Sequence, residues 1–129
     1  MKKILLLFIT ILLITVSCKK VAKAPLGPTD IRIRNITTLP MTNVTVNTYD
    51  STYNFGTINA NAVSDYHTFD RAYPKANIRA IINGQKYKTD TITSYAYMQY
   101  LSQIKATFEI WIEGNKLTIS RVVPESELK

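Results

Sequence analysis

The stretch ATFEIWIEGNKLTISRV, residues 106–122, decides the fold of this chain. Apolar and polar residues alternate on both sides of Gly114-Asn115, and a Gly-Asn pair between two such runs predicts a two-residue β-turn. A slip of one residue would scramble the apolar and the polar face, so the register of this hairpin is well specified. The turn sets the expected facing pairs: Glu113 with Lys116, Ile112 with Leu117, Trp111 with Thr118, Ile110 with Ile119 and Phe108 with Arg121.

A second hairpin is predicted at Asn83-Gly84, within ANIRAIINGQKYKTDTI, residues 76–92. Asn-Gly favours the type I′ turn, in which both central residues take a positive φ. The outer face of this hairpin places Arg79 opposite Lys88, and two like charges in that position normally cost roughly a few tenths of a kcal/mol. We therefore expect a candidate basic strip on the outer face: Arg79, Lys86 and Lys88.

Shorter alternations occupy the rest of the chain, at DIRIRNI (30–36) and TNVTVNT (42–48), with weaker ones near YNFGTI (53–58) and VSDYHTF (63–69). Together with the hairpins they give seven or eight strands at spacings of about 8 to 12 residues. This pattern predicts an all-β fold, an antiparallel β-sandwich that is immunoglobulin-like in general architecture. Closure into a barrel stays open as an alternative. The antibody-type Cys-Trp-Cys arrangement is absent, so the likeness concerns the sandwich only.

The N-terminus has the anatomy of a secretory signal. Two lysines follow the initiator methionine, and residues 4–16 are almost wholly apolar. As a helix this segment would span roughly 20 Å, whereas the hydrocarbon core of a bilayer is about 30 Å thick. We therefore predict a signal peptide over residues 1–17 rather than a membrane span.

The end of this signal, Thr15-Val16-Ser17-Cys18, resembles a bacterial lipobox. The resemblance implies cleavage between Ser17 and Cys18, transfer of a diacylglycerol to the Cys18 sulfur and acylation of its new amino group. Thr15 departs from the pattern, because leucine is usual at that place. Two or three acyl chains make membrane anchoring stable, whereas one chain gives only marginal binding. Because Cys18 is the only cysteine, its lipidation would leave no thiol for disulfides, metal binding or catalysis.

The remainder of the chain divides into a tether and one domain. Residues 18–28 contain the lipidated cysteine and a flexible stretch rich in lysine and proline, and residues 29–129 suffice for a single compact core. All nine acidic residues but only eleven of the sixteen basic ones lie in residues 24–129, so the domain is nearly balanced in charge. That balance argues against nucleic acid as a partner. The lipid anchor instead makes a membrane the expected partner.

Together with the lipobox, FGTINANAVSDYHTF (55–69) and AYPKANIRAIINGQKY (72–87) resemble the small uncharacterised lipoproteins of the Bacteroidota. In that group, export to the cell surface is associated with acidic residues soon after the cysteine, and here Lys19 and Lys20 stand in those places. The resemblance therefore implies the periplasmic face of the outer membrane. It supports the location and the fold, and it carries no established activity.

The sequence offers little for catalysis. His67 is the only histidine, and strand alternation predicts that it faces solvent. Glu109 and Glu113 lie four positions apart on one strand, roughly 13 Å, which exceeds the spacing of about 5 to 10 Å between glycosidase carboxylates. Metal-ligand spacings and phosphate-binding loops are missing from the sequence. We therefore expect no enzyme activity, no metal and no cofactor.

Aromatic side chains are the richer resource, since the chain holds eight tyrosines and one tryptophan. Trp111 falls on the polar face of its hairpin, where a large exposed ring marks a binding patch. Packing over the end of the sandwich is the default for the tyrosines, with ligand contact as the alternative, and cover by a sheet edge, a loop or the Tyr95 to Tyr100 segment is the alternative to an exposed Trp111. The candidate patch consists of four residues: Trp111, Tyr95, Tyr97 and Tyr100.

These observations lead to one expected function and two rivals. We expect a non-enzymatic envelope lipoprotein that binds another protein or assists envelope assembly. A carbohydrate-binding module that uses Trp111 and the tyrosines is the first rival. A small hydrolase is the second and weaker one.

Overall fold

The computed structural model describes residues 27–128, which form eight strands and one short 3₁₀ turn. The predicted signal peptide over residues 1–17, the lipidation site Cys18 and the tether up to residue 26 lie outside the described residues. Within the part of the chain that is described, no helix is long and apolar enough to cross a membrane.

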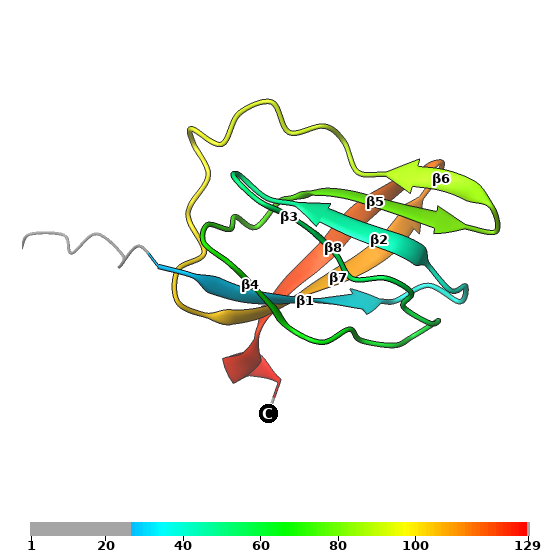
Figure 1. Ribbon diagram of the computed structural model, residues 1–129, viewed down its shortest axis with the longest axis horizontal. Helices are drawn as coiled ribbons and strands as arrows, with labels where there is room; N and C mark the ends of the chain where they lie inside the picture. The colour runs from blue at the N-terminus through cyan, green and yellow to red at the C-terminus, as the bar shows by residue number, and fades with distance from the viewer. Residues whose placement is uncertain (1–26, 129) are drawn as a thin grey trace, which may run out of the picture.

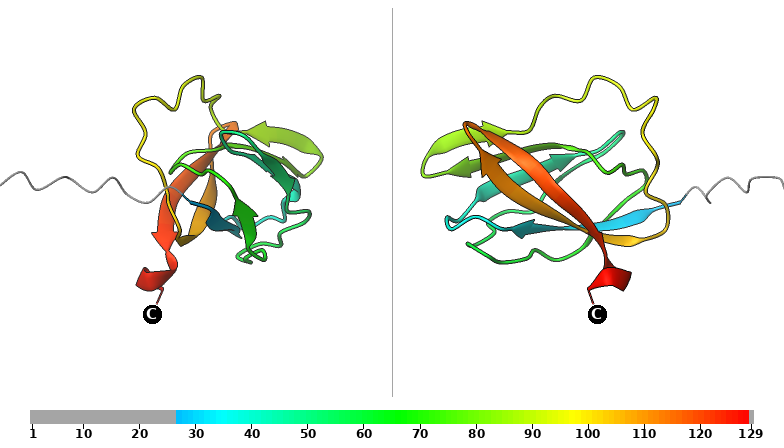
Figure 2. Two further views of the ribbon diagram at one scale, coloured as in Figure 1. Left: turned by 60° about the vertical axis from the view of Figure 1, so that its left-hand side comes forward. Right: turned by 180° about the vertical axis from the view of Figure 1, so that it is seen from behind.

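The strands form two four-stranded sheets that face each other (Figures 1 and 2). Sheet 1 has the order β4-β1-β7-β8, and sheet 2 has the order β3-β2-β5-β6. The predicted all-β sandwich of seven to eight strands is therefore confirmed. The elements are β1 (Thr29–Asn35), β2 (Thr42–Asn47), β3 (Thr52–Asn54), β4 (His67–Phe69), β5 (Asn77–Ile82), β6 (Gln85–Lys88), β7 (Lys105–Glu113), β8 (Lys116–Pro124) and the 3₁₀ turn η1 (Glu125–Glu127).

Sheet 1 contains one parallel pair in an otherwise antiparallel molecule. β1 lies between β4 and β7, antiparallel to β4 and parallel to β7, with a register that runs from Asp30 opposite Lys105 to Asn35 opposite Ile110. The first strand of the chain is thus internal to its sheet, and its long pairing is with a strand near the C-terminus.

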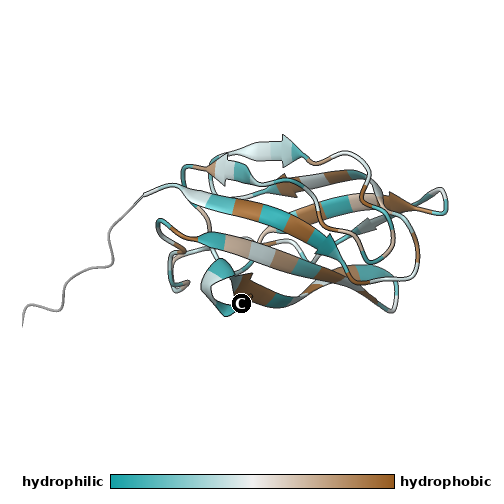
Figure 3. Cartoon of the chain, turned by 90° about the horizontal axis from the view of Figure 1, so that it is seen from below, coloured by the Kyte–Doolittle hydropathy of each residue, from teal (hydrophilic) through white to brown (hydrophobic). Residues whose placement is uncertain are grey.

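Alternation along the strands puts the apolar side chains between the two sheets, and the brown bands along the strands in Figure 3 follow this alternation. Both sheets contribute, because each strand turns every second residue inward. The fully buried side chains of this core include Ile31, Ile33, Val44, Val46, Phe69, Ile78, Phe108, Ile110 and Leu117.

Both predicted hairpins are present, and their turns differ. Asn83 and Gly84 both have a positive φ, 49° and 77°, as the type I′ turn requires. At the other turn Gly114 alone has a positive φ, 63°, which is the pattern of a type II′ turn. Arg79 faces Lys88 as expected.

Four of the five predicted pairs in the C-terminal hairpin are confirmed, from Glu113 opposite Lys116 to Ile110 opposite Ile119. The fifth was wrong, because Phe108 faces Val122 instead of Arg121. A β-bulge between these pairs adds Ser120 as an extra residue in β8, and the Ser120 hydroxyl donates to the carbonyl of Glu109 at 3.2 Å.

Asn35 is a polar group at the centre of the structure. Its buried side-chain amide donates to the carbonyls of Leu39, Ile58 and Asn59 at 2.7 to 3.1 Å. Its side-chain oxygen accepts from the backbone N–H and the hydroxyl of Thr37, at 2.9 and 2.7 Å. These bonds tie the connection after β1 to the connection between β3 and β4, and a buried network of this kind is stable only when each member is paired.

Residues 89–104 connect β6 of sheet 2 to β7 of sheet 1 (Figure 1, yellow). We call this stretch the crossing segment. It leaves sheet 2 beside the edge strand β8 of sheet 1, and it then passes one end of the sandwich before it enters β7.

Candidate functional site

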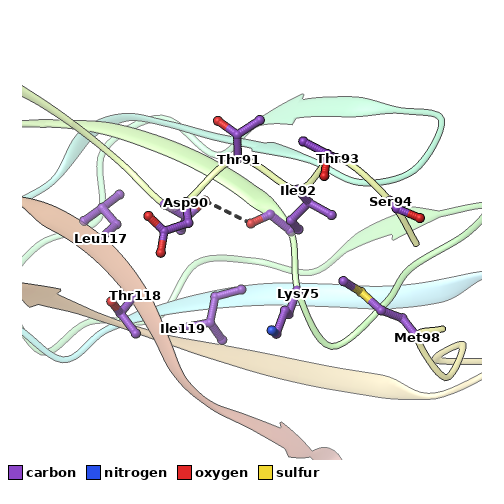
Figure 4. Close-up of a pocket in the computed structure, with 12 residues that line it drawn as sticks. Lys75, Asp90, Thr91, Ile92, Thr93, Ser94, Met98, Leu117, Thr118 and Ile119 are labelled. Atoms are coloured by element: carbon purple, nitrogen blue, oxygen red, sulfur yellow. Dashed lines mark hydrogen bonds between the residues drawn. The ribbon is translucent and has the colours of Figure 1, made fainter. Parts of the chain in front are cut away.

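A groove of about 420 Å³ lies between β8 and the first part of the crossing segment, and we call it the β8 groove (Figure 4). Its floor is largely apolar, its rim carries hydroxyl groups, and the side chain of Lys75 also lines it. The floor includes Ile92, Met98, Leu117 and Ile119, and the rim includes Thr89, Thr91, Thr93, Ser94 and Thr118.

The outer wall of the β8 groove is fixed by hydrogen bonds to the start of β5. Thr89 donates from its backbone N–H to the carbonyl of Ile78 at 2.9 Å and from its hydroxyl to the carbonyl of Ala76 at 3.1 Å, and the second of these bonds is dashed in Figure 4. The backbone N–H of Ile92 donates to the side chain of Asn77 at 2.9 Å. The wall therefore holds its distance from β8 without a ligand.

An ion pair closes one end of the β8 groove. The Lys116 amine donates to the Asp90 carboxylate at 2.7 Å, and this pair joins the first residue of β8 to the crossing segment. The hydrogen bond to Asp90 raises the pKa of Lys116 above its ordinary value.

The inner wall of the β8 groove is a free strand edge, because β8 pairs with β7 alone. Glu113 and Lys116 close the two-residue turn as a hydrogen-bonded pair. Along an antiparallel ladder such pairs alternate with pairs that exchange no hydrogen bonds, and Leu117 and Ile119 belong to the second kind. The backbone N–H and C=O groups of Leu117 and Ile119 consequently point away from β7. Within residues 27–128, no loop hydrogen bond reaches either of these residues.

Trp111 lies one strand in from this edge. It is 46% exposed on the outer face of sheet 1, and its cross-strand partner is Thr118, which lines the β8 groove. The predicted exposure of Trp111 agrees with the structure, and its neighbours are those of the groove.

The predicted aromatic patch is divided between two places. Tyr95 packs against Tyr73 and Tyr49, with ring centroids 4.8 and 5.6 Å away, and Tyr100 packs against Tyr73 at 5.5 Å. Burial raises the pKa of both Tyr95 and Tyr100. These two rings pack over the end of the sandwich, whereas Tyr97 is fully exposed at the crossing segment.

Among the ring contacts of the described residues, none joins Trp111 to these tyrosines. Trp111 lies six positions into β7, about 20 Å from the point where the crossing segment ends, because an extended strand rises about 3.3 Å per residue. The structure does not bring Trp111 and the three tyrosines into one platform. Distance along the strand separates them, although they are close in sequence.

The predicted basic strip is assembled on the outer face of sheet 2. Arg79 and Lys88 face each other across β5 and β6, with Lys86 two positions from Lys88 on the same strand. Arg79 and Lys88 line two adjacent hollows of about 260 and 450 Å³, and Lys86 lines the second.

His67 does not face solvent as predicted. It is half-buried and stacks on Tyr53 with ring centroids 3.6 Å apart, and it contacts Phe69 edge-on at 4.9 Å. Phe69 lies two positions further on β4 and belongs to the core, so His67 shares its inward direction. The single histidine therefore packs between the edges of the two sheets.

The acidic residues of the C-terminal hairpin have local partners. Glu109 forms an ion pair with Arg34 at 3.4 Å, and Glu113 accepts from the Thr118 hydroxyl at 3.3 Å. Over residues 27–128, no three His, Cys, Asp or Glu side chains are grouped so that they can hold a metal ion.

Comparison with known proteins adds one likeness of fold. No protein-family model matches the chain, and no curated protein matches it. The NMR structure of a protein from Eubacterium rectale is similar, with a TM-score of 0.50 and 17% identity, over 74% of this chain and 90% of that one. This likeness concerns the fold alone.

Proposed function

We propose that this chain is an exported lipoprotein, anchored through Cys18, whose sandwich binds an extended segment of another envelope protein along β8. The observation that carries the proposal is the free nine-residue edge of β8 beside the β8 groove. The chain's own role is to present this edge at a fixed place on the membrane surface.

The edge has the geometry that strand addition needs. The outward backbone groups of Leu117 and Ile119 are two positions apart, about 7 Å, which is the repeat at which an extended peptide offers its own N–H and C=O groups. The apolar floor of the groove would take alternate side chains of the guest, and the threonine rim would bond to its polar groups.

The four edges of the sandwich are unequal, and this inequality supports β8 as the binding edge. β3 and β4 have three residues each, and β6 has four residues with two lysines. Short or lysine-bearing edges are the usual protection against unwanted pairing. β8 has nine residues, its one lysine, Lys116, is held by Asp90, and its bulge lies beyond the first half, which is left open to the groove.

Trp111 extends the same surface and favours a protein over a glycan as the guest. Tryptophan dominates the binding energy of many protein interfaces when it lies near a groove. A glycan platform would need further rings beside Trp111, and Tyr95 and Tyr100 are packed elsewhere.

The anchor rests on the lipobox residues, and the periplasmic face of the outer membrane is the proposed location. Growth with a radiolabelled fatty acid should label the wild-type protein, and Cys18→Ala should lose the label and leave the membrane fraction. Labelling that persists in Cys18→Ala would contradict the anchor and leave the β8 proposal to its own test.

The β8 proposal is tested by removing one outward N–H. A photo-crosslinking residue at Thr118 should give one discrete protein adduct in living cells, and Ile119→Pro should abolish it because proline lacks the N–H that the guest accepts. Ile119→Ala is the matched control, since it loses the side chain and keeps the N–H. An adduct that survives Ile119→Pro as well as Ile119→Ala would exclude strand addition. Binding of the same protein to neutral glycans, lost in Trp111→Ala, would favour the carbohydrate rival.

A further inference from the structure

The basic strip of sheet 2, made of Arg79, Lys86 and Lys88, has no role in the proposed binding at β8 or in the stability of the fold. Arg79 lies directly opposite Lys88, and like charges in this position destabilise a sheet. The ion pairs among residues 27–128 involve other basic residues, namely Arg34, Arg71, Arg121 and Lys116. The repulsion in the strip is therefore left uncompensated by the chain.

The two hollows beside the strip have different linings, and the smaller one is rich in uncharged hydrogen-bonding groups. Thr45, Asn47, Thr52 and Thr91 line the hollow of about 260 Å³ together with Arg79 and Lys88. The larger hollow, of about 450 Å³, shares Arg79 and Lys88 with the first and adds Lys86, together with Asn43, Ile81 and Tyr87. Acidic side chains line neither hollow, so the two form one continuous cationic surface.

We propose that this surface binds an acidic polysaccharide. The planar guanidinium of Arg79 suits two-point contact with a carboxylate, and Lys88 across the ladder supplies a second charge to the same group. Lys86 lies two residues before Lys88 on β6, about 7 Å away, so a second carboxylate of the same polymer would meet a further cation. The threonine and asparagine side chains then bond to the sugar hydroxyls between the acidic groups.

A membrane surface fits this strip less well than a polymer does. Interfacial binding needs apolar side chains that enter the lipid together with the lysines. The large exposed apolar residues described in the structure are Leu39, Tyr49, Tyr53, Val63, Tyr97, Trp111 and Leu128, and none of them lines either hollow. Ile81 and Tyr87 line the larger hollow but are half-buried, so the strip offers charge and hydrogen bonds without a protruding apolar group.

The proposal goes beyond the proposed function, because it uses the outer face of sheet 2 and leaves β8 in sheet 1 free. The domain would hold a polymer of the envelope on one sheet and a protein on the edge of the other. The two sites meet at Thr89 and Thr91, which line both, but the variants that test them lie on different sheets, so failure of one binding activity is distinguishable from failure of the other.

The test measures binding of polygalacturonate, a soluble uronate polymer, to the full-length protein held on a sensor surface. We expect saturable binding that weakens at least tenfold between 50 and 300 mM salt, since ionic contacts are screened. The double variant Arg79→Gln/Lys88→Gln should bind at least tenfold more weakly at 50 mM salt. Lys105→Gln/Arg121→Gln, which removes the same charge from sheet 1, is the matched control and should change the affinity less than twofold.

Three outcomes would overturn the proposal. If the control variant lost as much affinity for polygalacturonate as Arg79→Gln/Lys88→Gln, attraction by net charge alone would explain the binding. If neutral dextran bound as tightly as polygalacturonate, the carboxylates would not be recognised. Binding to phosphatidylglycerol vesicles that falls in Arg79→Gln/Lys88→Gln as much as polymer binding does would assign the strip to a lipid surface. Thermal unfolding of each variant confirms that the fold is kept.

Discussion

The outer faces of the two sheets use their charges in opposite ways. On sheet 1, Arg34 pairs with Glu109 at 3.4 Å, and Arg32 donates to the hydroxyl of Thr107 at 2.9 Å. Arg32 also lies 4.7 Å above the ring centre of Tyr66. Each of these cations is attached to a neighbouring strand or loop, so the charges on this face stabilise the fold.

On sheet 2 the corresponding positions repel each other. Arg79 faces Lys88 across the ladder, and neither contributes to an ion pair of the described residues. This difference shows that the role of a charged strand residue can be inferred only when its cross-strand partner is known. A paired charge indicates a structural role, and an unpaired charge that persists against repulsion indicates a binding role.

The largest expected effect comes from Arg32→Leu on sheet 1. It removes the donor from the buried hydroxyl of Thr107 and the cation above Tyr66, so we expect a loss of about 1 to 2 kcal/mol in the free energy of unfolding. Urea denaturation followed by fluorescence measures it. Arg79→Leu on sheet 2 is the matched control and should lose nothing, and an equal loss there would remove the contrast between the faces.

A smaller effect of opposite sign is expected from Lys88→Glu. The change replaces a repelling pair by an attracting one opposite Arg79, so the free energy of unfolding should rise by about 0.5 kcal/mol. Lys105→Glu on sheet 1 should show no such gain, because Lys105 lies 5.3 Å above the ring centre of Tyr66. Destabilisation by Lys88→Glu would mean that the strip has a structural partner.

Glu109→Gln should lower the free energy of unfolding by about 0.5 kcal/mol, which is typical of a partly exposed ion pair. A double-mutant cycle with Arg34→Gln measures the coupling between the two side chains. Coupling near zero would show that the pair adds nothing to sheet 1. The same cycle between Arg79 and Lys88 should give a coupling of opposite sign.

The smallest effect concerns the pKa of Lys116, which its hydrogen bond to Asp90 raises above 10.5. Asp90→Asn should return this pKa toward 10.5 in an NMR titration of the lysine side chains. Because the folded pKa is the higher one, the pair contributes stability below pH 10.5 and loses it as the pH rises through the folded pKa. An unchanged pKa in Asp90→Asn would mean that the groove is open at this end.

Local patterns account for what the sequence predicted well. Each hairpin is set by its own turn and alternation, so the pairing around Gly114 and the facing of Arg79 and Lys88 could be derived from adjacent residues. The basic strip was predictable for the same reason, since it lies within one hairpin. The bulge at Ser120 was missed, because nothing in the alternation marks an extra residue.

Features made by distant segments could not be derived in this way. The β8 groove exists because the crossing segment passes beside β8, and the sequence does not specify this path. The hydroxyl-rich run TDTITS, residues 89–94, is the one local feature that belongs to the groove. His67 was placed on the wrong face because its inward direction follows from Phe69 packing into the core. The separation of Trp111 from Tyr95 likewise depends on how the crossing segment meets β7.

The position of β1 inside sheet 1 has a consequence for the order of folding. β1 is the first of the described strands to leave the ribosome, and residues of its parallel partner lie 75 positions downstream. Loop closure over such a distance is slow, so sheet 1 cannot be completed until nearly the whole chain has been synthesised. Sheet 1 therefore stays open through nearly all of synthesis, and an open chain is the form in which the proposed export would take place.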